Sequence, residues 1–212
     1  MRSASACSAD TGLALALALA AAAAAAEPEA LTLSGLMARM AASPGVEARF
    51  REIRELELLA APLESRGELY FVPPDRLARF TTWPGPSALI VDGEALHYRE
   101  GDEVFDLSSS PAARAFADNL IVLFRGDLAS LEELYATAFE SQGSEWRLVL
   151  TPRRPPLSRV VASLSLRGDG AGMRQVSMLD TDGNRTTTLF EEADPQRRFS
   201  PEELERLFAT GP

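Results

Sequence analysis

The sequence predicts an α+β protein built on one highly curved antiparallel sheet, with helices covering its open face. Apolar periodicity changes along the chain in the order helix, about five strands, two helices, four or five strands, helix. Tight glycine-containing turns separate consecutive strands, which is typical of an antiparallel meander. Strands and helices do not alternate, so we do not expect a parallel doubly wound sheet.

The first half begins with a short amphipathic helix over residues 33–40, ended by Ser43-Pro44-Gly45. From residue 47 the apolar period changes to two, which predicts a strand reaching residue 58. Asp92-Gly93 between two apolar runs is a strong hairpin signal. The further strands predicted in this half cover residues 69–71, 76–83, 88–91, 95–99 and 104–107.

Two helices are predicted next. Ser110 is an N-cap before a proline, and Gly126 ends the first helix. Asp127 caps the second helix, whose apolar stripe continues to Ala138. The members of that stripe are Leu128, Leu131, Leu134, Tyr135 and Ala138.

Strands resume after residue 143 and a helix ends the chain. The predicted strands cover residues 146–150, 160–166, 173–179 and 185–190. Glycines at 143, 168, 170 and 183 mark the turns. Ser200-Pro201-Glu202-Glu203 is a capping box for the last helix.

The composition excludes several kinds of chemistry. All 21 basic residues are arginine, and Cys7 and His97 are the single cysteine and histidine. A Cys/His zinc site cannot be assembled from one of each, and a P-loop or a Schiff base needs lysine. A Ser-His-Asp triad would have to use His97. The net charge of −10 argues against nucleic acid. We expect neither an enzyme nor a cofactor.

The N-terminus has the pattern of an export signal. Residues 12–26 form an apolar stretch of about 15 residues, shorter than the roughly 20 that span a bilayer. Small residues then precede Glu27-Pro28, so we predict a cleavable signal over 1–26 and one domain over 27–212. Cys7 would leave with the leader, and a cysteine-free exported product suits a bacterial periplasm. An anchor or a low-complexity tail is the alternative.

Two local motifs have simple structural explanations. Asp180–Asn184 resembles the start of a calcium loop, and Glu191 stands at its twelfth position. Arg185 occupies the sixth position, where such a loop requires glycine, so a hairpin turn is favoured over a metal site. His97 lies in the middle of a predicted strand, which indicates a surface or core residue, and no Gly-x-Ser-x-Gly elbow occurs.

Charged residues alternate with apolar ones in the early strands. Glu52 and Arg54 share a strand face with Phe50, and Arg79 shares a face with Leu77. If the apolar residues point inward, the charged ones do too, which is costly unless they pair or stay hydrated. The interior is therefore a partly solvated cavity or contains a satisfied salt-bridge cluster. A face assignment wrong by one residue is the alternative.

Several segments together resemble the LolA family of outer-membrane lipoprotein carriers. Residues 50–54, 67–77 and 90–96, with Pro84, resemble its N-terminal half. The Gly-x-Leu-x-x-x-x-Pro-x-x-Leu run from Gly67 and the following Asp-Gly hairpin carry most of the signal. Residues 146–152 resemble its second sheet half, so the similarity covers roughly residues 30–190.

The resemblance implies an incomplete β-barrel with a helical lid and an apolar cavity. Family members carry lipoproteins through the periplasm by sheltering their acyl chains. They receive them from an inner-membrane transporter and pass them to an outer-membrane receptor. The expected ligand is thus a lipoprotein acyl chain or another lipid-like amphiphile, and we expect a monomer.

The chain departs from the general carriers at two places. They have an arginine, implicated in holding lid and barrel together, where this chain has Pro73 before Pro74. Their inward aromatic positions in the third strand correspond to Leu77 and Arg79. In this the chain resembles LolA-related proteins that accompany lipid or aryl-polyene biosynthesis. A lipid-sensing regulatory domain and an enzyme acting on an exported lipid or polysaccharide are the alternatives.

The predicted site is an apolar cavity with a few polar positions and neither catalytic nor metal-binding residues. The residues predicted for the sheet wall are Leu56, Leu58, Phe71, Leu77, Leu89, Val91 and Leu96. The residues predicted for the lid are Phe116, Leu120, Leu123 and Phe124. Arg54 and Arg79 are predicted to contact an anionic head group or Glu52.

Overall fold

The computed structural model describes residues 30–209, without the side chains of Ala112, Phe116, Asn119 and Leu120. The predicted signal over residues 1–26 lies outside the described residues. The helical elements are α1 (Leu33–Ala41), α2 (Pro111–Arg125), α3 (Leu128–Leu134), the 3₁₀ turn η1 (Leu157–Arg159) and α4 (Pro201–Leu207). Within residues 30–209, no helix is both long and apolar enough to span a membrane.

Two meanders of strands make up the sheet. The first comprises β1 (Val46–Glu55), β2 (Leu63–Val72), β3 (Arg76–Trp83), β4 (Ser87–Asp92), β5 (Ala95–Glu100) and β6 (Glu103–Asp106). The second comprises β7 (Tyr135–Gln142), β8 (Glu145–Pro152), β9 (Val161–Asp169), β10 (Gly172–Asp180) and β11 (Arg185–Asp194).

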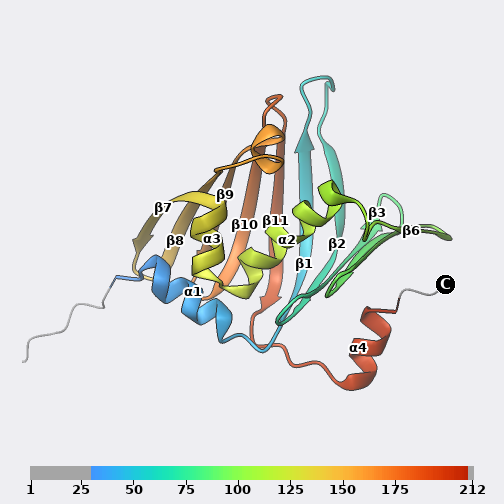
Figure 1. Ribbon diagram of the computed structural model, residues 1–212, viewed down its shortest axis with the longest axis horizontal. Helices are drawn as coiled ribbons and strands as arrows, with labels where there is room; N and C mark the ends of the chain where they lie inside the picture. Colours follow the sequence, from blue (N-terminus) through green and yellow to red (C-terminus); the bar gives the residue numbers. More distant parts are fainter. Residues whose placement is uncertain (1–29, 210–212) are drawn as a thin grey trace, which may run out of the picture.

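These strands form one antiparallel sheet in the order β6-β5-β4-β3-β2-β1-β11-β10-β9-β8-β7. Pairing of β1 with β11 joins the two meanders in the middle of the sheet. The edges are β6 and β7, so the barrel is incomplete, as predicted. Figure 1 shows the curved sheet with α1, α2 and α3 in front of one face and α4 apart from them.

Three sequence expectations were wrong in detail. The helix predicted through Ala138 ends at Leu134, and the strand β7 follows at once. Residues 135–142 pair with β8 along their whole length, and these ladder hydrogen bonds outweigh the helical spacing of the apolar residues. The first strand ends at Glu55 rather than residue 58, and β2 starts at Leu63 rather than residue 69.

The helix caps follow the sequence signals. Ser110, Asp127 and Ser200 accept backbone hydrogen bonds as N-caps, and Ser200 forms the complete capping box with Glu203. Gly126 ends α2 in the left-handed region at φ 70°. A Cβ atom at Gly126 would lie 2.3 Å from the carbonyl oxygen of Met37, so this glycine also permits the close approach of α1.

The buried apolar residues form three clusters. The largest lies between α1, α2, α3 and strands β8–β10, with Leu148 and Leu150 at its centre. A second lies between α2 and β2–β5 and includes Phe71. The third packs Leu207 and Phe208, from α4 and the residue after it, against the outer face of β3 and β4. The first two clusters cover the flanks of the concave face, and its middle is left to a cavity.

Candidate functional site

An apolar cavity lies between the concave face of the sheet and the helices above it. It holds about 1050 Å³ of atom-free space, including solvent at its opening. Both sheet halves and the lid line it. The residues that line it are Glu52, Arg54, Leu69, Leu77, Arg79, Leu89, Leu123, Phe124, Tyr135, Leu157, Val161, Leu164, Met173, Val176, Met178, Thr186, Thr188 and Phe190.

The cavity exists because the central strands carry polar side chains on their inward face. Glu52 pairs with Thr188 across the β1–β11 ladder, and Arg54 pairs with Thr186. We call these four residues the central seam. No helix can bury its apolar stripe against the seam without desolvating charges. The lid helices therefore pack against the apolar flanks and bridge over the middle.

Glu52 is the centre of a charged cluster in this seam. It is only 7% exposed, and its Oε1 accepts a hydrogen bond from Arg54 Nε at 3.0 Å. Its Oε2 accepts from Arg79 Nη2 at 3.0 Å and from Thr188 Oγ1 at 3.2 Å. These charged side chains line the cavity, as the alternation predicted, and the predicted salt-bridge cluster forms part of its wall.

Arg79 is held between this carboxylate and an aromatic ring. Its guanidinium carbon lies 4.1 Å from the centroid of the Phe50 ring, a cation–π geometry. Burial lowers the pKa of Arg79, while the charge of Glu52 opposes that shift. With two arginines and one glutamate, the cluster carries a formal charge of +1.

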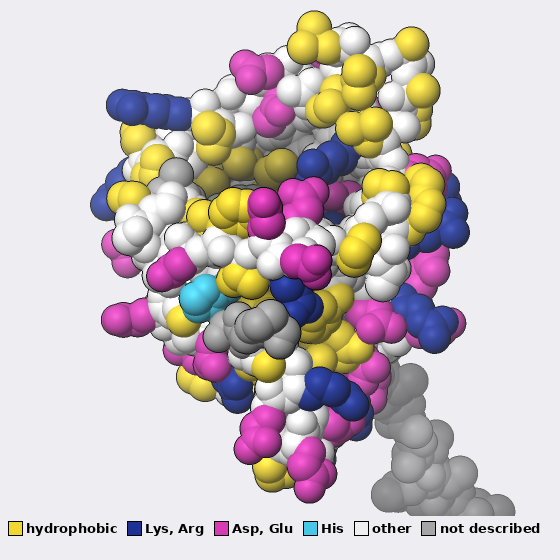
Figure 2. All heavy atoms as spheres, turned by 90° about the vertical axis from the view of Figure 1, so that its right-hand side faces the viewer, with side chains coloured by type: hydrophobic (Ala, Val, Ile, Leu, Met, Phe, Trp, Pro, Cys, Tyr) yellow, Lys and Arg dark blue, Asp and Glu magenta, His cyan; other side chains and the backbone are white. Residues whose placement is uncertain are grey.

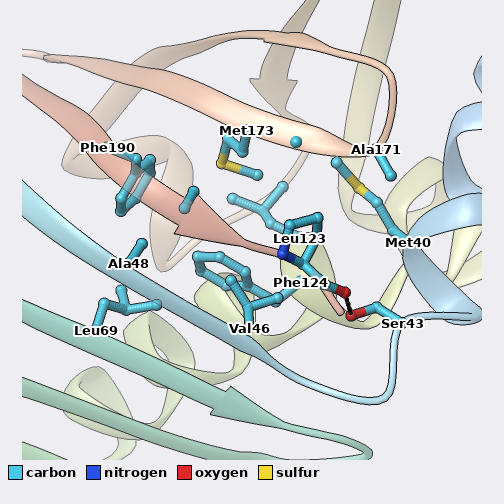
Figure 3. Close-up of a pocket in the computed structure, with 13 residues that line it drawn as sticks. Met40, Ser43, Val46, Ala48, Leu69, Leu123, Phe124, Ala171, Met173 and Phe190 are labelled. Carbon is cyan, nitrogen blue, oxygen red and sulfur yellow. Dashed lines mark hydrogen bonds between the residues drawn. The ribbon is translucent and has the colours of Figure 1, made fainter. Parts of the chain in front are cut away.

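A smaller pocket of about 480 Å³ of atom-free space adjoins the cavity at the end near α1 (Figure 3). Figure 3 shows Phe124 and Leu123 reaching from α2 between Phe190, Met173 and the β1 side of this pocket. The two pockets share five apolar lining residues and are therefore adjacent. The residues that line both are Leu69, Leu123, Phe124, Met173 and Phe190.

The surface around the opening is partly apolar. Figure 2 shows a hollow on the β6 side, with apolar side chains along it and basic and acidic ones at its edge. Leu58, between β1 and β2, is 96% exposed, and Val160, just before β9, is also exposed. Asn184 Oδ1 accepts a hydrogen bond from the backbone of Glu57, which ties the β1–β2 and β10–β11 turns together.

Side chains of α2 attach the lid to the sheet. Arg114 donates to the carbonyl oxygens of Gly93 and Glu94 in the β4–β5 turn, at 3.1 Å each. Phe124 stacks on Phe71, with centroids 5.6 Å apart, and meets the Phe190 ring edge to face. Arg114 therefore ties α2 to the β4–β5 turn.

The predicted site residues fall into four groups. Leu77, Leu89, Leu123 and Phe124 line the cavity, together with the three predicted charged residues. Phe71, Val91 and Leu96 are buried beneath α2 and line neither pocket. Leu56 and Leu58 lie beyond the end of β1, and the exposed Leu58 does not face the cavity. The side chains of Phe116 and Leu120 lie outside the described part.

Sequence reasoning missed the second half of the cavity wall. The missed wall includes Val176 and Met178 of β10, and Thr186 and Thr188 of β11. Both strands were predicted, and in each strand the two residues are two positions apart and so share one face. The pairing of β11 with β1, which brings that face opposite the first strands, has no local signal in the sequence.

The calcium-like motif forms a hairpin turn, as favoured from sequence. Asp180 Oδ1 accepts hydrogen bonds from the backbone amides of Asp182 and Asn184, and Oδ2 accepts from the Asn184 side chain. These bonds lower the pKa of Asp180. His97 lies in β5 opposite Asp106 of β6, away from the cavity. Among residues 30–209 no three potential metal ligands cluster together.

Residues 24–205 match the family described as outer membrane lipoprotein carrier protein LolA-like. The chain belongs to this family. The match spans both sheet halves, the lid and all the cavity-lining residues. The predicted family resemblance is therefore confirmed. No curated protein sequence matches the chain.

Solved structures similar to this LolA-like chain are distant. A LolA superfamily protein from Nitrosomonas europaea has 13% identity and a TM-score of 0.47, covering 84% of this chain and 97% of that one. The MucA/MucB complex of Pseudomonas aeruginosa has 14% identity and a TM-score of 0.44, covering 81% and 60%. The Mycobacterium tuberculosis lipoprotein LppX has 11% identity and a TM-score of 0.40, covering 79% and 97%.

The LolA-like cavity of this chain offers extensive apolar contact and one cationic cluster. Its titratable groups are Glu52, Arg54, Arg79 and Tyr135, and burial raises the pKa of the Tyr135 phenol. Among the described side chains that line the larger cavity, none is a serine, cysteine or histidine. This arrangement suits the binding of an amphiphile, with its apolar part inside and a polar group at the seam.

Proposed function

We propose that this protein is a periplasmic, non-enzymatic carrier that shelters the acyl chain of a lipoprotein or of another lipid-like amphiphile. Residues 1–26 would be the cleaved export signal and 27–212 a single carrier domain. An inner-membrane donor would load the cargo, and an outer-membrane receptor would accept it. The observation that carries this proposal is the apolar cavity beneath a helical lid, with about 1050 Å³ of atom-free space that includes solvent at its opening.

The free energy of chain burial makes such binding reasonable. Each methylene removed from water contributes about 0.8 kcal/mol, so ten methylenes supply roughly 8 kcal/mol before association costs. Leucine, valine, methionine and phenylalanine side chains predominate in the lining, which suits an alkyl chain. A ligand without a long alkyl chain would gain much less from this site.

Release requires a change in the lid or a better receiver. Leu123 and Phe124 are the lid residues that contact the cavity, and both belong to the last turn and a half of α2. A small displacement of this end of α2 would join the cavity to the smaller pocket near α1. Cargo could then move from the cavity into the smaller pocket without full unfolding of the lid.

The direct test is to identify what the protein carries. The protein would be purified from a native periplasm, its N-terminus sequenced and its lipid extract analysed by mass spectrometry. We expect a start near residue 27 and an amphiphile in near-stoichiometric amount. Recovery of no amphiphile, together with no binding of the apolar dye N-phenyl-1-naphthylamine, would contradict the carrier function.

A matched pair of variants tests whether the dye occupies this cavity. Val176 lines it, whereas Gln175, its neighbour in β10, donates to Ser177 on the other face of the sheet. Val176→Phe fills the cavity and should weaken dye binding at least tenfold, whereas Gln175→Phe should leave it unchanged. Equal binding by the two variants would place the dye elsewhere.

A further inference from the structure

The charged cluster formed by Glu52, Arg54 and Arg79 has an unbalanced charge. Arg54 and Arg79 both pair with Glu52, which leaves one positive charge at the edge of an otherwise apolar cavity. The groups whose charges act on Arg79 are Glu52, Arg54 and Tyr98, and none of these is a second carboxylate. A buried net charge is unfavourable unless a ligand or water compensates it. A ligand with one negative charge would balance this cluster.

The geometry leaves hydrogen-bond donors for that anion. A guanidinium has five N–H groups. The hydrogen bonds to Glu52 occupy Nε of Arg54 and Nη2 of Arg79. The Arg54 side chain is 55% exposed and that of Arg79 is 23% exposed, so the pair extends from the opening into the cavity. Glu52 and the Phe50 ring hold Arg79 in place, which reduces the entropy lost when a ligand binds.

We propose that the cavity selects an amphiphile with a monoanionic head group, a carboxylate or a phosphodiester, whose oxygen atoms bind Arg54 and Arg79 beside Glu52. This inference rests on the proposed carrier function and names the class of its cargo. The alkyl chain would then extend from the seam toward Phe124 and Phe190, which line the far end of the same cavity. Glu52 acts as a positioning residue that limits the net charge to +1 and so disfavours dianions.

Competition against bound N-phenyl-1-naphthylamine tests the head group while the chain stays constant. The competitors are dodecanoate, dodecanol, dodecyltrimethylammonium and dodecyl phosphate. We expect dodecanoate to displace the dye at a concentration at least tenfold lower than dodecanol, and the ammonium compound to be weakest. Lysophosphatidylglycerol against lysophosphatidylcholine then distinguishes a phospholipid source from a free fatty acid.

Charge variants test whether the preference comes from the cluster of Glu52, Arg54 and Arg79. Arg79→Met keeps the apolar stem and should abolish the preference for dodecanoate over dodecanol, measured as the ratio of the concentrations at which the two competitors displace the dye from that variant. Glu52→Gln raises the cluster to +2 and should favour dodecyl phosphate over dodecanoate by at least tenfold relative to the native protein. If Arg79→Met does not fold, as judged by circular dichroism, the more exposed Arg54→Met provides the same comparison.

The possible failures are distinguishable. If the dye binds and dodecanol competes as well as dodecanoate, the head-group inference is wrong and the carrier function stands. A dodecanoate preference that survives both arginine variants also overturns the inference, because the anion would then bind elsewhere. If neither the dye nor any amphiphile binds, the carrier function itself fails.

Discussion

The flanks and the central seam of the concave face differ in what covers them. On the flanks, apolar residues such as Leu148 and Phe71 are fully buried by α1, α2 and α3. At the seam, Glu52, Arg54 and the two threonines face a cavity instead of a helix. The same sheet thus uses one part of its inner surface for folding and another for a ligand, and the inward residue type decides which.

This difference predicts that stability and binding can be altered separately. Residues of the flanks should change the free energy of unfolding with little effect on dye affinity per folded molecule. Residues of the seam should change ligand preference more than stability.

The largest loss of stability is expected on the flank. Leu148 in β8 is 1% exposed, and Leu148→Ala would remove buried methyl groups and leave a void. Such truncations cost about 2–5 kcal/mol. Urea unfolding measures the loss, and the dye titrated at low temperature should bind the folded fraction unchanged. A loss below about 1 kcal/mol would mean that this flank is much less tightly packed than its burial indicates.

Glu52→Gln should have an intermediate effect. The substitution leaves two arginines without their shared carboxylate, and an unsatisfied buried hydrogen-bonding group costs about 1–3 kcal/mol, or more if it is charged. Because water at the cavity opening can hydrate the arginines, we expect the loss of stability to fall in the lower half of that range. The double variant Glu52→Gln/Arg79→Met should recover part of the loss in urea unfolding. If the stability losses of Glu52→Gln and Arg79→Met simply add in the double variant, the two residues are not coupled.

The lid attachment should matter less for stability. Arg114→Ala removes two hydrogen bonds to carbonyl oxygens of the β4–β5 turn, with an expected cost of about 1 kcal/mol. Hydrogen exchange should accelerate in residues 111–118, and dye dissociation should be faster. Asp118→Asn, which keeps both bonds to the turn, is the control. Unchanged exchange in Arg114→Ala would mean that packing alone holds this end of α2.

The smallest effect is expected on the outer face of the seam strand. Arg51 donates to both carboxylate oxygens of Glu64 there, and this bond lowers the pKa of Glu64 from its ordinary 4.5. The stability that the Arg51–Glu64 pair contributes is therefore complete above pH 4.5, and it is lost as the pH falls through the lowered pKa of Glu64. Glu64→Gln should slightly reduce the acid dependence of unfolding and leave stability at pH 7 almost unchanged. A large loss at pH 7 would contradict the contrast between the two faces.

Local signals predicted most single elements. The caps at Ser110, Asp127 and Ser200 and the Asp-Gly hairpin are interactions between neighbouring residues, so the sequence contains them in full. The four-residue spacing of Tyr135 from Leu131 predicted a helix, although it is also compatible with a strand. Tyr135 pairs with Pro152 of β8, and this pairing makes it part of a strand. Leu58 was placed on the wall because the strand was extended past its true end at Glu55.

The sequence by itself determined which residues alternate on each strand, and hence that Glu52, Arg54 and Arg79 share the apolar face. Only the tertiary structure decided that they meet, because Glu52 and Arg79 are 27 residues apart and Thr188 is 136 residues from Glu52. Pairing of β1 with β11 brings Thr188 to Glu52, and the β1–β2–β3 meander brings Arg79 to it. Such non-local pairing depends on which faces can be buried together across the whole chain, and that free-energy balance has no local counterpart in the sequence.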